Sequence, residues 1–224
     1  MKYNNIIKHA KKITDKASGG RPILNGVYHN QNYIVASDSH RLIKSEVDKV
    51  NFDEHVLDLK TNELIDQAQS YPNVNSIIDG LNEHIKILQP KNHVKPIKEM
   101  LKMCKALKYS QVVIESVNNE NNPQKSYNEL ILRPHDNIDT KPIRDFNVGK
   151  LSVNFMLHSQ FEEEEKVQLA FNIDYFIQAI DFIQETKEDF YLYIPREKVG
   201  IVGFKNSDLT KENYTYIVNP LRVV

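Results

Sequence analysis

The feature that most constrains the fold is a unit that occurs three times along the chain, an amphipathic helix with short strands around it. Apolar residues recur at helical spacing in residues 3–17, in a segment that begins near Pro96 and ends near Lys108, and in residues 173–185. A helix with one apolar stripe must bury that stripe against another layer. The repeated order therefore predicts an α+β fold built from internal repeats of one helix plus antiparallel strands.

Strands are predicted from alternating or continuous apolar runs bounded by turn residues. The expected strands span residues 23–29, 32–38, 40–47, 84–89, 111–116, 129–134, 150–159, 166–172, 190–195, 199–204 and 213–220. The turn signals "SYPNVN" and "DGLN" lie between the first and second units. We therefore expect a domain boundary near residue 80, which divides the chain into residues 1–80 and 81–224.

Composition excludes several classes of protein. No run approaches the eighteen or so apolar residues that a membrane span requires. The N-terminal segment "MKYNNIIKHAKKITDK" lacks the apolar core of a secretory signal, and the single cysteine, Cys104, excludes an internal disulfide framework. A cytoplasmic protein without a membrane segment is expected. The net charge of −1 does not indicate a globally basic nucleic-acid binder, so any contact with DNA depends on where the charges lie.

The segment "VASDSHRLIK", residues 35–44, is where the chain most clearly suggests a functional site. Three interpretations are a Ser/Asp/His catalytic cluster, a phosphate clamp and the polar rim of a binding pocket. A catalytic triad usually draws its members from distant positions, whereas Ser37, Asp38 and His40 lie in one turn. A phosphate clamp is disfavoured because no glycine-rich loop here precedes a helix. An Asx turn at Asp38 is the ordinary alternative, and it leaves His40 and Arg41 as a polar edge.

No metal or cofactor is expected. The eight histidines include no pair at the helical spacing of metal ligands, and Cys104 stands alone. The run "FEEEE" at residues 161–165 offers four carboxylates, but adjacent strand residues point to opposite faces of a sheet. Such a run is a poor cage for a cation.

Lysines form stripes on the polar faces of the first two helices, while the third helix has no lysine on its polar side. A solvated surface face is the ordinary explanation of such stripes. Their nearly uniform positive sign favours a further role, because a face of one sign attracts an anionic polymer and lysine contacts phosphates without reading bases. The lysines that we predict to contact duplex DNA, independently of sequence, are Lys8, Lys11, Lys12, Lys98, Lys102 and Lys105.

Three separated segments carry a resemblance to a known family. Residues 21–44, "RPILNGVYHNQNYIVASDSHRLIK", resemble the part of bacterial sliding clamps, the beta subunits of DNA polymerase III, in which a strand pair leads into a T-D-[SG]-H-R-L turn. Residues 70–78, "SYPNVNSII", are similar to the motif that ends the middle clamp domain. Residues 167–183 and 216–224 resemble the last clamp domain and its C-terminal strand. The matches follow the order of the family.

The resemblance implies a fold and a function without catalysis. Clamp helices line an inner face, clamp sheets lie outside, and subunits close into a homo-oligomeric ring around duplex DNA. A peptide-binding pocket tethers the DNA polymerase and the clamp loader through short motifs. Carried over residue by residue, that pocket would consist of Leu24, Ser37, Ser39, His40, Arg41, Leu42, Ile78, Ile217, Val218, Asn219, Pro220, Leu221, Arg222 and Val223.

The chain also departs from the family pattern. The usual bacterial subunit has three domains, whereas this chain has room for two, the first of them truncated and similar to a middle domain, so a ring would need three or four copies. Ser37 replaces threonine, Asn219 replaces a methionine-like residue and Asp79 stands where proline is common, which implies a pocket of different selectivity. Such a short clamp would suit a phage or a mobile element. The alternative is a clamp-derived interaction protein that binds polymerase or loader peptides, or a host clamp, without forming a ring.

Overall fold

The protein combines helices and antiparallel strands in an α+β fold, as the sequence predicts. The computed structural model describes residues 1–17, 20–47, 51–66, 71–118, 128–135, 155–161, 167–196, 200–207 and 214–221. The helices are α1 (Tyr3–Thr14), α2 (Asn75–Asp79), α3 (Val94–Ala106) and α4 (Ile173–Thr186). The strands are β1 (Gly26–Gln31), β2 (Tyr33–Ser37), β3 (Arg41–Glu46), β4 (Phe52–Asp58), β5 (Ile85–Gln89), β6 (Gln111–Asn118), β7 (Asn128–His135), β8 (Phe155–Phe161), β9 (Gln168–Asn172), β10 (Phe190–Ile194), β11 (Val202–Asn206) and β12 (Tyr214–Val218).

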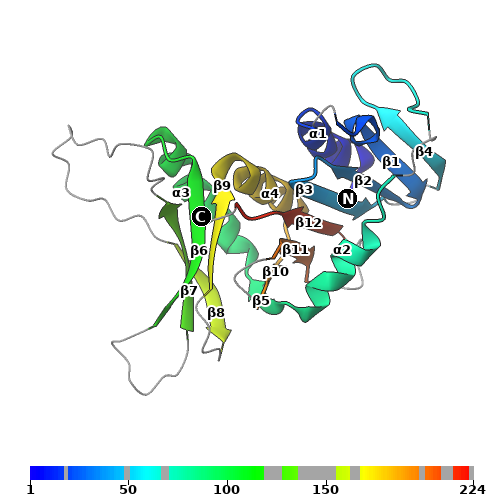
Figure 1. Ribbon diagram of the computed structural model, residues 1–224. Helices are drawn as coiled ribbons and strands as arrows, with labels where there is room; N and C mark the ends of the chain where they lie inside the picture. The colour runs from blue at the N-terminus through cyan, green and yellow to red at the C-terminus, as the bar shows by residue number, and fades with distance from the viewer. Residues whose placement is uncertain are drawn as a thin grey trace.

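The strands form two sheets whose order repeats one topology three times (Figure 1). The eight-stranded sheet has the order β4-β1-β2-β3-β12-β11-β10-β5, and the four-stranded sheet has the order β8-β7-β6-β9. After α1, three strands form a meander and β4 returns to pair with β1. After α3, the next three strands do the same and β9 pairs with β6. After α4, the meander is completed by β5, which pairs with β10.

The first and third units join through their strands. β3 pairs antiparallel with β12, with Leu42 opposite Ile217 and Arg41 opposite Val218. Because successive strand residues point to opposite faces, Leu42 and Ile217 lie on one face of the sheet while Arg41 and Val218 lie on the other. We call the antiparallel β3–β12 pairing the seam. The eight-stranded sheet thus contains strands from both sides of residue 80.

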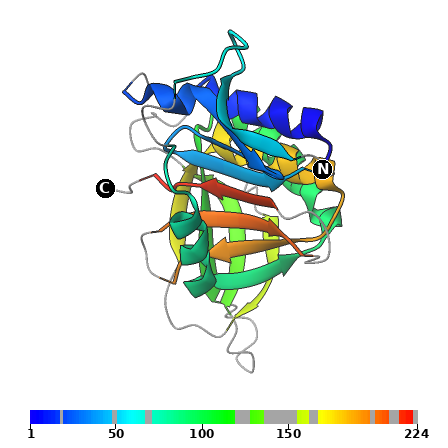
Figure 2. The ribbon, with the colours of Figure 1, turned by 90° about the vertical axis from the view of Figure 1, so that its right-hand side faces the viewer.

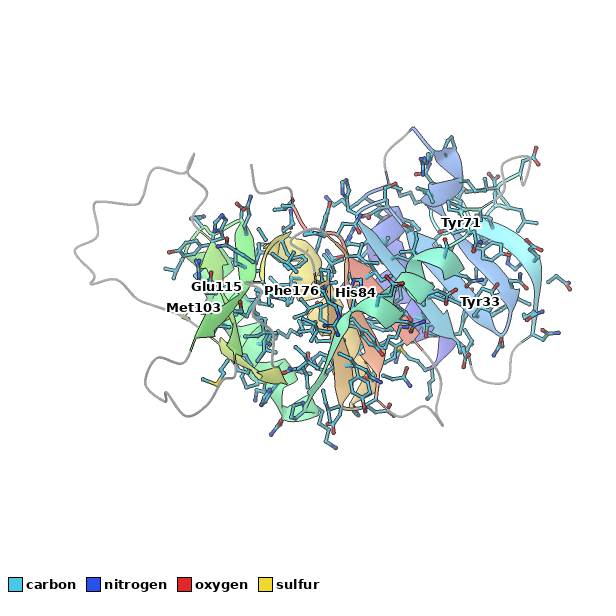
Figure 3. The ribbon with its side chains drawn as sticks, turned by 60° about the horizontal axis from the view of Figure 1, so that its bottom comes forward. Tyr33, Tyr71, His84, Met103, Glu115 and Phe176 are labelled. Carbon is cyan, nitrogen blue, oxygen red and sulfur yellow. The ribbon has the colours of Figure 1, made fainter. Side chains whose placement is uncertain are left out.

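The main core lies between the helices and the two sheets. Its buried residues come from α1, α3 and α4 and from strands of both sheets. Phe176 of α4 lies in the interior (Figure 3), and its ring centroid is 5.5 Å from that of Phe171 in β9 and 5.6 Å from that of Phe204 in β11. One aromatic side chain therefore packs against both sheets at once, which ties them to α4.

Helix α4 has clear capping residues at both ends and one apolar face. Asn172 caps its N-terminus, because the side-chain carbonyl accepts hydrogen bonds from the backbone N–H groups of Asp174 and Tyr175. Its C-terminal cap, Lys187, takes the left-handed conformation that commonly ends helices. The six buried residues of α4 are all apolar, and its polar residues lie on the other side.

The connecting segment, residues 71–84, links the first and second units and covers part of the outer face of the eight-stranded sheet. Figure 2 views this sheet from its outer side, with α2 in front of it. Leu81 of the segment is buried and packs against Gly203 of β11, where an added Cβ would lie 2.5 Å from the Leu81 Cδ1 atom. Glycine at this position lets the segment approach the backbone of the sheet closely.

Several predicted boundaries differ from the structure. Pro22–Asn25 forms a 3-10 turn where a strand was expected from residue 23. The first residues of the strand expected at 150–159 lie outside the described part of the chain, and β8 spans Phe155–Phe161. β4 was not predicted, because its sequence "FDEHVLD" contains several charged residues, as is common in edge strands. Among the described helices, none is long and apolar enough to cross a membrane.

Candidate functional site

The turn between β2 and β3 is held by its own side chains. One carboxylate oxygen of Asp38, Oδ1, accepts hydrogen bonds from the backbone N–H groups of His40 at 2.9 Å and Arg41 at 2.7 Å. The Ser37 hydroxyl donates to the Arg41 carbonyl at 2.9 Å. Ser39 has a φ of 72°, a left-handed conformation that turns of this kind require. The expected Asx turn at Asp38 is confirmed by these bonds.

The same bonds give the catalytic interpretation no support. A nucleophile needs a base within hydrogen-bond reach, and the base needs a group that orients it. Here the Ser37 hydroxyl is directed to a backbone carbonyl, and Asp38 Oδ2 binds the Arg41 side chain. His40 is exposed, and its ring stacks with Tyr175 at a centroid distance of 6.1 Å.

Arg41 is a buried anchor between elements. Its side chain is fully buried, and Nε and Nη2 donate to Asp38 Oδ2 at 3.0 and 2.5 Å. The guanidinium also donates to the Gln178 side chain of α4 and, at 3.3 Å, to the Lys12 carbonyl of α1, and it lies 4.2 Å from the centre of the Tyr175 ring. These contacts tie the turn to two helices, so the Arg41 side chain is not accessible at the surface of the turn.

The C-terminal segment lies beside the turn, although about 180 residues separate them in sequence. The Asn219 backbone N–H donates to the His40 carbonyl at 2.8 Å, and the Asn219 side-chain amide donates to the Ser39 carbonyl at 2.9 Å. The Leu221 N–H donates to the Ala170 carbonyl of β9 at 2.7 Å. The expected proximity of the "HRL" and "NPL" segments is confirmed. Arg222 and Val223 lie outside the described residues.

The described residues of the predicted pocket divide into four groups. Ser39 and His40 are exposed, and Ser37, Ile78, Asn219, Pro220 and Leu221 are half-buried. Leu24, Leu42 and Ile217 are buried and belong to two small apolar clusters outside the main core. Arg41 and Val218 point to the inner face of the sheet, and Val218 belongs to the main core. The structure thus brings most of the set to one junction and turns two members away from it.

The six predicted DNA-contacting lysines lie on α1 and α3, on either side of α4. In Figure 1 the three helices lie in a row with α4 in the middle, and α4 packs against both of the others. Lys11 pairs with Asp15 at 3.3 Å and Lys102 with Glu99 at 3.0 Å, each within its own helix region. The other four lysines pair with carboxylates of α4. The uniform sign of each stripe holds for a helix considered alone, whereas the packed face carries both signs.

No group of three or more histidine, cysteine, aspartate or glutamate side chains is placed to hold a metal ion within the described ranges. Cys104 is a free, buried thiol, and burial raises its pKa, which makes it a poor nucleophile.

Comparison with solved structures decides the fold. No protein-family model matches the sequence, and neither does any of the curated proteins. A Helicobacter pylori beta clamp in complex with diflunisal aligns with a TM-score of 0.70 at 15% identity over 99% of this chain. The DNA polymerase sliding clamp of Bacillus subtilis gives 0.64 at 15% identity over 98%, and the DNA polymerase III subunit beta of Borrelia burgdorferi gives 0.66 at 17% over 100%. The chain has the fold of a bacterial sliding clamp.

The clamp fold is present over a shorter length than in these relatives. The chain spans 64% of the Helicobacter pylori and Borrelia burgdorferi chains and 63% of the Bacillus subtilis chain. At about 15% identity the similarity concerns the path of the backbone, and the roles of individual side chains must be argued from this structure.

The sequence did not predict two features of the candidate functional surfaces. Tyr71 contacts both small apolar clusters and stacks on Tyr28 with a centroid distance of 5.1 Å, and burial raises the pKa of its hydroxyl. Figure 3 shows it near the end of the molecule formed by β1–β4. The aromatic residue before Pro72 was a usable signal. The second is the row of α4 carboxylates, whose spacing is visible in the sequence but whose partners on other helices are not.

Proposed function

We propose that the protein is a sliding-clamp-like processivity factor. Copies of the chain close into a homo-oligomeric ring around duplex DNA, and a surface site on each copy tethers a replicative DNA polymerase or the clamp loader through short peptide motifs. The function requires no catalysis and no cofactor, and its setting is the cytoplasm, as in replication by a phage or mobile element. Residues 1–80 and 81–224 form its two clamp-like domains.

The observation that carries this proposal is the row of three helices in a clamp fold. α3, α4 and α1 are backed by sheets, and the seam continues the sheet from one unit into the next. Extending the same arrangement through further copies gives a curved wall with helices on its inner side. Because the chain spans about two thirds of the clamp relatives, three or four copies are needed to close the ring.

The tethering site is proposed at the junction of the β2–β3 turn and the C-terminal segment. Exposed His40 and Ser39 and half-buried Asn219, Pro220 and Leu221 form its accessible part. Buried Leu24, Leu42 and Ile217 support it from below, and Ile78 borders it. Arg41 holds the turn in place from the inner side. Such a site suits a peptide with an apolar anchor and polar flanks.

The oligomeric state tests the ring. Native mass spectrometry should give a single particle of three or four times the chain mass of 26.1 kDa, and negative-stain images should show closed rings with a central hole. A strict monomer at working concentration would contradict this proposal.

Primer extension with the replicative polymerase from the same source tests tethering. The protein should lengthen the products, and His40→Ala should shorten them again because it removes an exposed side chain of the site.

A second candidate function is favoured by the pairing of all six predicted DNA-contacting lysines with carboxylates. A clamp-derived protein that binds polymerase or loader peptides, or a host clamp, without encircling DNA needs no free cationic face. Replacing Lys98, Lys102 and Lys105 by glutamate separates the two candidates. DNA binding should be lost if the ring surrounds DNA, whereas stimulation or inhibition of the polymerase in solution should persist if the protein acts only through peptides.

A further inference from the structure

The polar face of α4 carries three carboxylates at helical spacing. Asp174, Asp181 and Glu185 are separated by seven and four residues, which places them on one side of the helix. α4 is the middle helix of the row, so this side lies between α1 and α3 (Figure 1). An acidic stripe therefore runs between the two basic ones.

Each of these carboxylates reaches a lysine on a neighbouring helix. Glu185 lies 2.9 Å from Lys8 Nζ of α1, and Asp174 lies 2.5 Å from Lys105 Nζ of α3. Asp181 contacts both neighbours: its Oδ1 is 2.7 Å from Lys98 Nζ of α3 and its Oδ2 is 3.6 Å from Lys12 Nζ of α1. Four of the six predicted DNA-contacting lysines thus have an α4 carboxylate as partner.

Asp181 and Glu185 are held in their charged form. Burial alone would raise the pKa of Asp181 and of Glu185, but hydrogen bonds and charges from Lys98 and from Lys8 outweigh burial and lower both values. His9, buried beside Glu185 at 3.1 Å, has a pKa lowered by its own burial and adds little positive charge at neutral pH. At neutral pH Asp181 and Glu185 therefore carry their negative charges.

A phosphate that approaches this face must displace a carboxylate. The ion pairs of Lys8 and Lys105 are weak, since these side chains are 62% and 57% exposed, so displacement is most feasible there. Lys98 is only 21% exposed beside Asp181. The displaced carboxylate then stays close to the phosphate and repels it, which reduces the gain from each new contact. A lysine that contacts a phosphate releases a counterion from the DNA. Because a carboxylate stays beside it, each of these lysines adds less to the DNA affinity than an unpaired lysine would.

We infer that the α4 carboxylates compete with DNA phosphates for the lysines of α1 and α3, and so set the salt concentration above which the helix face releases duplex DNA. This inference rests on the proposed function in one respect, because it takes the helix face as the DNA-facing surface. Because its lysines are paired with carboxylates, the face holds DNA weakly. Weak contacts permit sliding, while a closed ring keeps the protein on the DNA.

The test replaces the acidic stripe by neutral isosteres. Fluorescence anisotropy with a short duplex DNA compares the unmodified protein with the variant Asp174→Asn, Asp181→Asn, Glu185→Gln over about 50 to 200 mM salt. The variant should bind at least about tenfold more tightly at the lower salt. Its plot of log affinity against log salt should be steeper by about 0.9 for each lysine that gains a phosphate, hence by up to about 3.6 for the four lysines that pair with α4.

A charge-matched variant is the control. Asp53→Asn, Glu63→Gln, Glu83→Gln removes the same three charges from exposed positions outside the three helices. It should match the unmodified protein within about twofold. An equal gain in this control would assign the effect to net charge and overturn the inference. The single variant Asp174→Asn, at a 51% exposed side chain, keeps the fold and should steepen the plot by about 1.

The outcomes separate the inference from the proposed function. If the protein forms rings and binds DNA but the stripe variant has the same DNA affinity and salt dependence as the unmodified protein, the inference fails and the function stands. If the protein is a monomer yet the stripe variant gains DNA affinity, the encircling function fails and the inference stands. If neither protein binds the duplex even at the lowest salt, both fail.

Discussion

At the residue scale, burial decides which polar groups act at the surface and which hold the fold. His40 and Arg41 are adjacent in sequence, yet one is exposed and the other is enclosed by Asp38, Gln178 and Tyr175. Strand alternation separates them only because β3 has helices on one side and the outer surface on the other. A buried guanidinium without its carboxylate would be strongly destabilising, so Asp38 and Arg41 act as one structural unit.

His29 links stability to pH. Its side chain is buried, its ring stacks on His55, and burial and then the charge of His55 lower its pKa from 6.5 to about 4. Its Nδ1 bonds the Val27 carbonyl at 3.0 Å and its Nε2 bonds the Tyr3 hydroxyl at 2.9 Å, an arrangement that fits the neutral ring. Between pH 6.5 and 4 the unfolded chain therefore binds a proton that the folded protein does not.

Stability should consequently fall as the pH drops from 6.5 toward 4. The loss of unfolding free energy attributable to His29 should be at most about 3 kcal/mol. Urea unfolding at pH 7 and at pH 4 measures it. His29→Phe should reduce the difference between the two pH values by most of that amount, whereas His40→Gln, at an exposed position, should retain the full difference. An unchanged difference in His29→Phe would contradict this assignment.

At the element scale, the connecting segment is fixed to the outer sheet by shape. Leu81 is fully buried against Gly203, and Tyr71, Val74 and Ile78 complete the contact with the outer-face clusters. The segment has few regular hydrogen bonds of its own, because α2 spans only Asn75–Asp79. Its position therefore depends on apolar burial and on the absence of a side chain at residue 203.

Gly203→Ala should destabilise the protein by about 1–3 kcal/mol, because the new methyl group would overlap the Leu81 side chain. Urea unfolding gives the magnitude, and the double variant with Leu81→Ala should show coupling between the two positions. Gly80→Ala is the matched control: its position has open space and a φ of −58°, so the change should be neutral or slightly stabilising. Equal effects at both glycines would refute the role given to Leu81.

At the scale of the whole molecule, one core unites segments from both proposed domains. The main core includes Ile6, Ala10 and Ile13 of α1 together with residues of α3, α4 and both sheets. The seam adds five paired residues on each strand across the same boundary. Two domains joined by a continuous sheet and a continuous core have no separate interiors through which either could unfold first.

We therefore expect a single unfolding transition. Far-UV circular dichroism and the fluorescence of the tyrosines, in a chain without tryptophan, should give coincident urea curves. Asp38→Ala, which leaves Arg41 buried without its carboxylate, should move both curves together by about 3–5 kcal/mol. Two separate transitions would contradict a common core and favour domains that unfold one at a time.

The sequence by itself determined the repeated helix-and-strand order, the Asx turn and the clamp resemblance, because periodicity, turn chemistry and motifs are local properties of the chain. It missed β4, whose polar residues belong to an exposed sheet edge, and it assigned Arg41 and Val218 to the same site as their neighbours. Only the tertiary structure decided which face of a strand meets the helices and which carboxylates meet the lysines. Electrostatic pairing acts through space, so Asp181 and Lys12, which are far apart in the sequence, neutralise each other only once α4 packs beside α1.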